Sequence, residues 1–182
     1  MEPGSRIKTF NSKKGNEVIF RYPKAEDLED CLAFANNLIA EDTFVELSGN
    51  PKTRQEEKKW LDELLEQVKK GEKIHLVAVV NGKYAGSGEV RIGKFRHSHV
   101  GELGISLRKE YRNEGIGTEL MNVLIDEARR MGLTLVTLGC FENNSAACHL
   151  YEKMGFARAG VIPNAIKWKG GFVGEVKFYR SL

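Results

Sequence analysis

The chain has 182 residues, of which 41% are hydrophobic and 29% are charged, and its formal net charge is +3. These values are ordinary for a soluble globular domain, and so small a net charge gives no reason to expect a nucleic-acid partner. Three cysteines, Cys31, Cys140 and Cys148, are too few for a disulfide framework and indicate a reducing, cytoplasmic location. No apolar run is as long as a membrane span, and the N-terminus lacks the apolar stretch of a signal peptide, so we expect no membrane partner.

The hydrophobic pattern predicts strands and helices that alternate within a single domain over residues 1–182. We expect residues 1–15 to form a flexible N-terminal extension. The predicted elements, in chain order, are strand 17–21, helix 26–39, helix 53–71, strands 74–80, 83–92 and 102–107, helix 117–131, strand 133–140, helix 145–154 and strands 155–162 and 171–180. The segments 41–52, 93–100 and 163–171 are expected to be irregular or loops.

Local signals support the boundaries of three of these elements. Thr53 and Glu56 have the spacing of a capping box at the start of the second helix, and Gly71 is placed to end that helix. Asn81-Gly82 is a strong signal for a tight turn, so strands 74–80 and 83–92 should form a hairpin.

The most informative segment is ELGISLRKEYRNEGIGTELM, residues 102–121. It predicts a strand, a short charged turn with Arg112, Gly115 and Gly117 in Arg-x-x-Gly-x-Gly spacing, and then an amphipathic helix. Several backbone N–H groups at the start of a helix have no intrahelical partner, and glycines let a ligand approach them closely. The segment therefore predicts a site for a phosphorylated ligand.

Two common phosphate-binding motifs do not fit this segment. A Walker loop requires Lys-Ser or Lys-Thr after its last glycine, and neither follows Gly117. A dinucleotide fingerprint requires three glycines directly after the first strand of the fold, whereas Arg112 stands at the first position here and the turn lies past mid-chain.

A second unit, LTLVTLGCFENNSAACHLYEKMGF, covers residues 133–156 and predicts an apolar strand, a short helix and a Gly-Phe turn. Together the two units resemble the GNAT superfamily of N-acetyltransferases. The first unit is similar to the family's R/Q-x-x-G-x-G/A segment, and the second to its N-x-x-A-x-x-x-Y-x-x-x-G-F segment. The matching residues are Arg112, Gly115 and Gly117, followed by Asn144, Ala147, Tyr151, Gly155 and Phe156.

The resemblance implies an α+β fold with a central, mostly antiparallel mixed sheet of about six or seven strands, one splayed strand pair and about four flanking helices. It also implies acetyl-CoA as the cofactor, with the glycine turn around its pyrophosphate and its pantetheine paired with the free edge of strand 102–107. The expected cofactor-binding residues are Ile105, Ser106, Leu107, Arg112, Asn113, Glu114, Gly115, Ile116, Gly117, Thr118, Asn144, Ala147 and Tyr151. For Ile105 and Leu107 we expect the role to lie in the backbone, with the side chains in the core.

Tyr151 is the candidate general acid. A phenol keeps its proton at neutral pH and can donate it to a departing thiolate. Glu102 and Glu89, on the two central strands, are the candidates for a base that takes a proton from the amine. The resemblance leaves open whether such a base is used, because some members of the family simply admit the neutral amine.

Substrate-binding residues are expected on the other side of the cleft, where the family diverges. The candidates are Glu41, Asp42, Phe44, Trp168 and Glu175, a set that can recognise a charged amine with an apolar stem. A solvated loop is the alternative for Glu41 and Asp42, and coverage of the core edge is the alternative for Trp168. The histidines and cysteines show no metal-ligand spacing, so we expect no metal.

The implied activity is acetyl transfer from acetyl-CoA to a primary amine by direct attack in a ternary complex. The amine is left open among a protein N-terminus or lysine, a polyamine and a small molecule, and the protein is expected to be a monomer or a homodimer. Two alternatives are a GNAT-like domain that binds acyl-CoA without catalysis, as a sensor or scaffold, and a nucleotide-binding module of a different fold. The sensor has no need of the proton donor Tyr151, and the nucleotide module leaves the second motif unexplained.

Overall fold

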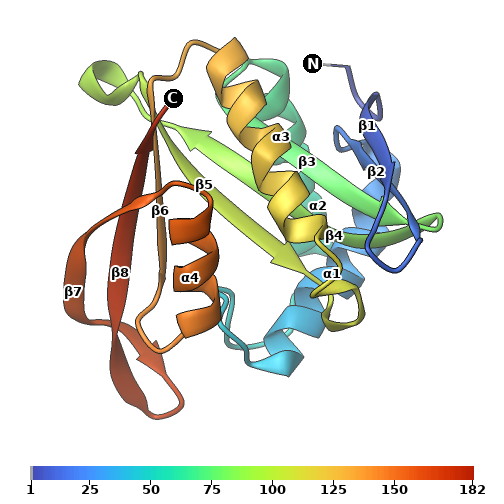
Figure 1. Ribbon diagram of the computed structural model, residues 1–182. Coiled ribbons are helices and arrows are strands. Elements are labelled where there is room, and N and C mark those ends of the chain that lie inside the picture. Colours follow the sequence, from blue (N-terminus) through green and yellow to red (C-terminus); the bar gives the residue numbers. More distant parts are fainter. Residues whose placement is uncertain (1) are drawn as a thin grey trace.

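The computed structural model describes residues 2–182, which form one mixed sheet of eight strands with helices on both faces (Figure 1). The strand order is β1-β2-β3-β4-β5-β6-β8-β7. The elements are β1 (Arg6–Asn11), β2 (Glu17–Arg21), α1 (Leu28–Glu41), α2 (Arg54–Lys69), β3 (Lys73–Val80), β4 (Lys83–Ile92), β5 (Val100–Leu107), α3 (Ile116–Arg130), β6 (Leu135–Phe141), α4 (Ser145–Lys153), β7 (Ala157–Trp168) and β8 (Gly171–Ser181). Short 3-10 turns occur at η1 (Ala25–Asp27), η2 (Phe95–His97) and η3 (Lys109–Tyr111).

The sheet opens between β5 and β6, its single parallel pair within the described residues. These strands pair only from Val100 with Leu135 to Glu102 with Thr137. Beyond that point β5 stays paired with β4 as far as Leu107, while β6 stays paired with β8 as far as Phe141. The two strands therefore diverge (Figure 1), and the expected splayed pair is confirmed.

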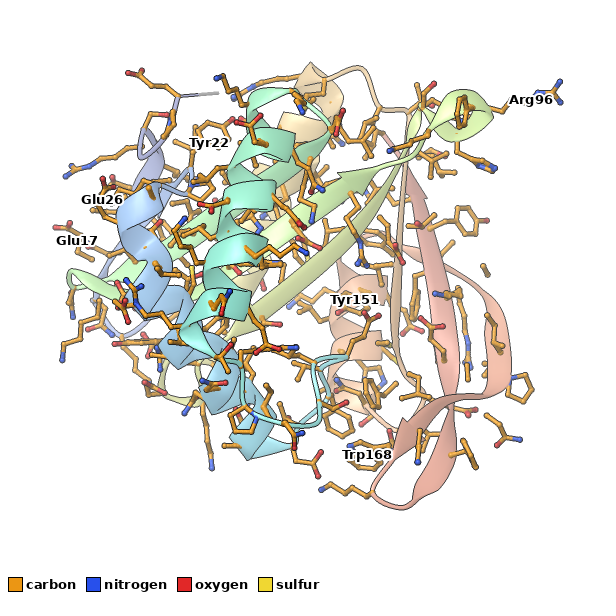
Figure 2. The ribbon with its side chains drawn as sticks, turned by 180° about the vertical axis from the view of Figure 1, so that it is seen from behind. Glu17, Tyr22, Glu26, Arg96, Tyr151 and Trp168 are labelled. Atoms are coloured by element: carbon orange, nitrogen blue, oxygen red, sulfur yellow. The ribbon has the colours of Figure 1, made fainter. Side chains whose placement is uncertain are left out.

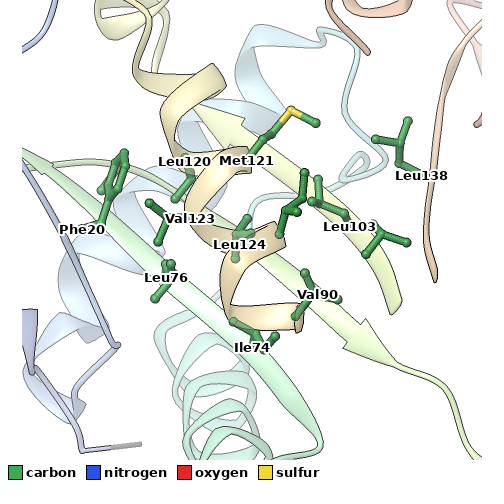
Figure 3. Packing of buried hydrophobic residues seen from close by; sticks show 14 of the residues in the cluster. Phe20, Ile74, Leu76, Val90, Leu103, Leu120, Met121, Val123, Leu124 and Leu138 are labelled. Atoms are coloured by element: carbon green, nitrogen blue, oxygen red, sulfur yellow. The ribbon is translucent and has the colours of Figure 1, made fainter. Parts of the chain in front are cut away.

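The main core lies between the sheet and α3. Leu120 and Leu124 of α3 are fully buried against Leu76 of β3 and Leu103 of β5, as Figure 3 shows. Gly88 on β4 permits this close packing, because a Cβ there would lie 2.7 Å from Leu124 Cδ1. On the opposite face, a smaller cluster of Cys31, Phe34, Leu38, Val77 and Tyr84 packs α1 against β3 and β4. The expected α+β architecture with four helices is confirmed.

Two sequence-based expectations need correction. Residues 6–11, placed in a flexible extension, form the edge strand β1, which pairs with β2 and raises the strand number to eight. The expected loop 163–171 is mostly strand, since β7 continues to Trp168 after an irregularity in the register between Ile162 and Ile166. Both segments are largely exposed, so they lack the apolar pattern from which strands are predicted. None of the helices that the structure describes combines the length and apolar content needed to span a bilayer.

Candidate active site

The predicted phosphate turn lies between β5 and α3 and has the shape of an anion site. Asn113 and Gly115 both have positive φ, 64° and 82°, and Gly115 is the N-cap of α3. No side chain caps this helix start. Its first N–H groups are thus left without side-chain acceptors, and the positive end of the helix dipole adds to their attraction for an anion.

Gly117 lies in the first turn of α3, facing the end of β5. A Cβ at Gly117 would lie 3.4 Å from Ile105 Cδ1 and 3.6 Å from Leu107 Cδ1. The side chains of Ile105 and Leu107 therefore pack against the start of α3, as expected. The backbone of β5 beyond Glu102 has no partner strand on the β6 side, so its edge is available to pair with an extended ligand.

Arg112 is held by two partners at the edge of the turn. Its Nε donates a hydrogen bond to the Leu107 carbonyl at 3.0 Å, and its two terminal nitrogens donate to both carboxylate oxygens of Glu41. The hydrogen bond from Arg112 lowers the pKa of the Glu41 carboxyl. Because α1 extends to residue 41, Glu41 lies against the phosphate turn, and Asp42 ends α1 in a left-handed conformation. Neither residue is among those that line the cavity described below, and their expected role in binding the amine stays a prediction.

The Glu114 side chain points away from the turn. Its carboxylate accepts hydrogen bonds from Ser12 Oγ at 2.8 Å, Asn16 Nδ2 at 2.9 Å and Lys14 Nζ at 3.1 Å. Glu114 thus ties the β1–β2 turn to the phosphate turn. The Glu114 side chain is therefore occupied, and only its backbone could contact a cofactor. The sequence did not predict this contact between Glu114 and the β1–β2 turn.

A cavity of about 650 Å³ lies on the α1/α2 side of the sheet and extends to the opening between β5 and β6. Its lining combines six glutamates with aromatic and aliphatic side chains. Among the lining residues are Phe34, Phe44, Lys52, Glu46, Glu56, Glu57, Trp60, His75, Glu89, Arg91, Glu102, Ser106, Cys140, Asn144, Tyr151 and Glu175.

Tyr151 reaches this cavity from α4 (Figure 2). Asn144 is the N-cap of α4, and its side-chain oxygen accepts a hydrogen bond from the Ala147 N–H at 3.2 Å. The Tyr151 ring packs against Phe156 and Phe178. Burial, together with the neighbouring thiols of Cys140 and Cys148, raises the pKa of Tyr151 to about 12. The phenol therefore keeps its proton at any physiological pH.

The candidate bases Glu89 and Glu102 both line the cavity, but in different electrostatic surroundings. Burial would raise the pKa of Glu89, yet its interactions with His75 and Lys73 prevail and lower it to about 2. Glu89 is thus a fixed negative charge and a weak base. Glu102 is more exposed, and one of its oxygens lies 3.2 Å from Arg91 Nη2.

The expected substrate residues Phe44, Trp168 and Glu175 lie together near the β6 end of the cavity. Phe44 stacks on Trp168 with ring centres 5.2 Å apart, and both rings contact Phe141. Glu175 lines the cavity and accepts a bond from Lys177 Nζ at 2.6 Å. Trp168 is not among the residues that line the cavity, but it stacks on Phe44, which does line it.

The sequence analysis missed the residues at the α2 end of the cavity. They are Lys52, Glu56, Glu57, Trp60 and His75. Two features of the sequence could have indicated them. His75 is a polar residue within the otherwise apolar strand IHLVAVV, and Glu57 lies one helical turn before the buried Leu61, on the same face of the helix. Among residues 2–182, no cluster of three or more His, Cys, Asp or Glu side chains is suited to hold a metal ion.

Comparison with known proteins agrees with this geometry. The acetyltransferase (GNAT) family pattern matches residues 39–156. The L-amino acid N-acyltransferase MnaT of Escherichia coli is 34% identical over 86 residues, which span 47% of this chain and 48% of MnaT. The chain thus spans about half the length of this curated relative.

Solved structures of acetyltransferases share the whole fold. A GNAT-family acetyltransferase from Streptococcus pneumoniae is 28% identical, with a TM-score of 0.80 over 91% of this chain and 99% of that one. RimL, a ribosomal L7/L12 alpha-N-protein acetyltransferase solved in complex with coenzyme A, has a TM-score of 0.84 over 98% of both chains at 14% identity. The matched pattern, the shared fold and the two motifs in their places show that this chain belongs to the GNAT acetyltransferase family.

Proposed function

We propose that this protein is an N-acetyltransferase that transfers an acetyl group from acetyl-CoA to a primary amine within a ternary complex. The observation that carries the proposal is the opening between β5 and β6, which joins two sites. On one side lies the uncapped start of α3 with its glycine turn, and on the other lies the carboxylate-lined cavity with Tyr151.

The residues present fit a CoA ester. The N–H groups of Gly115, Ile116, Gly117 and Thr118 are positioned to receive a pyrophosphate, and the free edge of β5 suits an extended amide chain such as pantetheine. When bound, acetyl-CoA supplies an activated thioester carbonyl. Backbone N–H groups near Ser106 or Leu107 would hold the carbonyl oxygen and stabilise the negative charge that develops on it.

The cavity supplies the remaining steps. Glu89 stays ionised and attracts a cationic amine, while Glu102, which is open to solvent, accepts the proton that the amine must lose before it can attack. Tyr151 then donates its proton to the leaving sulfur. The phenol is suited to this role because its raised pKa keeps it protonated and because it faces the cavity from α4.

A sensor or scaffold that binds acyl-CoA without turnover is the alternative. It would need the phosphate turn, but it would need neither Tyr151 at the opening nor a charged cavity on the amine side. The names of the relatives indicate different acceptors: an L-amino acid for MnaT and a ribosomal protein for RimL. The amine that this protein acetylates therefore has to be inferred from its own cavity. The free thiols of Cys31, Cys140 and Cys148 support the proposal of a reducing, cytoplasmic location.

The test is thiol release from acetyl-CoA in the presence of a panel of primary amines, together with calorimetric titration of CoA. Amine-dependent release that saturates in both substrates supports the transferase. Tight CoA binding with no release for any amine class would favour the sensor, and absence of CoA binding would reject both.

A further inference from the structure

The α2 end of the cavity contains a buried histidine with unused hydrogen-bonding capacity. His75 on β3 is only 3% exposed and lines the cavity, and neither of its ring nitrogens has a hydrogen-bond partner. Its Nδ1 lies 3.5 Å from Glu89 Oε2, which is too long for a good hydrogen bond. Buried polar atoms are normally satisfied, so an unsatisfied imidazole at a cavity wall points to a ligand that completes it.

Two carboxylates line this histidine's end of the cavity, together with an aromatic ring: the buried one of Glu57 and the exposed one of Glu56, which also accepts the capping hydrogen bonds of Thr53. Trp60 packs edge-on against His75 with ring centres 6.0 Å apart. Glu57 is 6% exposed, and burial raises its pKa even though Lys52 acts in the opposite direction. We call Lys52, Glu56, Glu57, Trp60 and His75 the α2 subsite.

The carboxylates of the α2 subsite are poorly neutralised. Two cations close to Glu56 and Glu57 in sequence form ion pairs with other carboxylates: Arg54 with Glu29 at 2.6 Å and Lys58 with Asp62 at 2.6 Å. No described cation forms an ion pair with Glu56 or Glu57, and Lys52 is the one cation of the subsite itself. Three other glutamates of the cavity each have an ion-pair partner: Lys73 for Glu89 at 3.1 Å, Arg91 for Glu102 at 3.2 Å and Lys177 for Glu175 at 2.6 Å.

The charges of the whole cavity leave a negative excess. Six glutamates line it, whereas the cations that line it or pair with these glutamates are Lys52, Lys73, Arg91 and Lys177. In formal charges, with His75 left out of the count, the six glutamates exceed these four cations by two. An excess of negative charge around one cavity attracts a ligand that brings positive charges.

The α2 subsite is distant from the reacting end. His75 lies on β3 and Cys140 on β6, three strands away in the sheet order. Neighbouring strands lie about 4.8 Å apart, so His75 and Cys140 are separated by about 14 Å across the sheet. The opening between β5 and β6 increases this distance. One ligand that meets both ends must be elongated.

We propose that the α2 subsite binds a distal ammonium group of the substrate, and that the substrate is an elongated oligoamine with two ammonium groups besides the reacting amine. The assignment rests on the proposed acetyltransferase function. Carboxylates and a neutral imidazole nitrogen accept hydrogen bonds, and the ammonium groups of an oligoamine only donate them. Its alkyl segments suit Trp60, Phe34 and Phe44.

Other amine classes match this lining less well. A peptide would bring backbone carbonyls into a cavity that offers mainly acceptors, and each buried carbonyl without a donor is unfavourable. A free amino acid would need an uncommitted cation for its carboxylate, but Arg91 is already engaged with Glu89 and Glu102, which leaves Lys52 alone.

The test compares spermidine with butylamine, L-methionine and a short peptide of neutral side chains by kcat/KM for thiol release from acetyl-CoA. Spermidine should exceed butylamine by about 100-fold or more, since each charge-assisted contact contributes about 10- to 100-fold. Glu57→Gln and His75→Phe should each lower the ratio of spermidine to butylamine at least about tenfold. Glu63→Gln, an exposed change on the same helix, is the matched control and should leave that ratio unchanged. Circular dichroism and CoA titration confirm that each variant is folded.

The outcomes separate this proposal from the proposed function. Equal kcat/KM for spermidine and butylamine, or a preference for L-methionine or the peptide, overturns the oligoamine assignment while the acetyltransferase stands. If no amine is acetylated but CoA binds, the proposed function fails. Calorimetry with spermidine alone then decides the subsite: binding lost in Glu57→Gln supports it, and no binding to the unaltered protein overturns it.

Discussion

Tyr151→Phe is the sharpest test of the proposed chemistry, because it removes one oxygen and keeps the ring. The ring packs against Phe156 at 6.2 Å and Phe178 at 5.7 Å between centres, and a phenylalanine preserves both contacts. The side chain is partly buried and packs against the core cluster of the domain, so the variant should fold and should bind CoA nearly as tightly as the unaltered protein.

The size of the effect follows from the role of the hydroxyl. Positioned general acids contribute about 10²- to 10⁴-fold to rate, which corresponds to about 3–5 kcal/mol in the activation barrier. Burial, with the thiols of Cys140 and Cys148, raises the pKa of Tyr151 to about 12, so the proton is present across the whole assay range. We therefore expect kcat to fall by about 10²-fold or more with little change in the KM for acetyl-CoA.

The pH profile gives a second readout. Because the pKa of Tyr151 lies near 12, the acid is almost fully protonated below about pH 10, and a rise in kcat with pH below that value must come from the amine or its base and not from Tyr151. The assay is steady-state thiol release, and Tyr179→Phe, at an exposed position on β8, is the matched control. Equal kcat in Tyr151→Phe and unaltered protein would refute the argument and leave solvent as the proton donor.

Three further predictions concern the cofactor side and the carboxylates. Gly117→Val should weaken CoA binding about tenfold or more, because the valine methyl groups extend from a Cβ position that is already 3.4 Å from Ile105 Cδ1. Thermal-shift titration with CoA measures this loss. The control is Gly160→Val, which lies in open space on β7 and should bind CoA normally. Glu41→Gln should lower the KM for acetyl-CoA about two- to fivefold, because it frees the Arg112 guanidinium from its ion pair. The KM for the amine should stay unchanged. A change confined to the KM for the amine would place Glu41 in the amine site. Glu89 has a folded pKa of about 2 against an ordinary 4.5, so its stabilisation is complete above about pH 4.5 and disappears as the pH falls towards 2. Urea unfolding at pH 5 and pH 2 measures how far the free energy of unfolding falls on acidification. This fall should be smaller in Glu89→Gln than in the unaltered protein, by up to about 3 kcal/mol. Equal falls in the two proteins would contradict the pairing of Glu89 with Lys73 and His75.

The parts of the site that lie within one short stretch of chain were determined by the sequence itself. The Arg112-x-x-Gly115-x-Gly117 turn adopts positive φ at its glycine and starts an uncapped helix, as its residues require. Asn144 caps α4 through the Ala147 N–H, and this places Tyr151 two turns further along the same helix. These features depend on backbone preferences and hydrogen bonds between near neighbours, which a sequence specifies directly.

Contacts between distant segments were decided only by the tertiary structure. His75 meets Glu89 because β3 and β4 pair in one register, and Trp60 reaches His75 because α2 packs across β3. Glu41 meets Arg112 because α1 ends beside the turn that precedes α3, a contact that the sequence did not predict. Such contacts follow from strand register and from the packing of helices on the sheet, which the local pattern of polar and apolar residues does not encode. The motifs therefore identified the family and its chemistry, whereas the charge and length of the cavity on the α1/α2 side emerged only when the strands and helices came together.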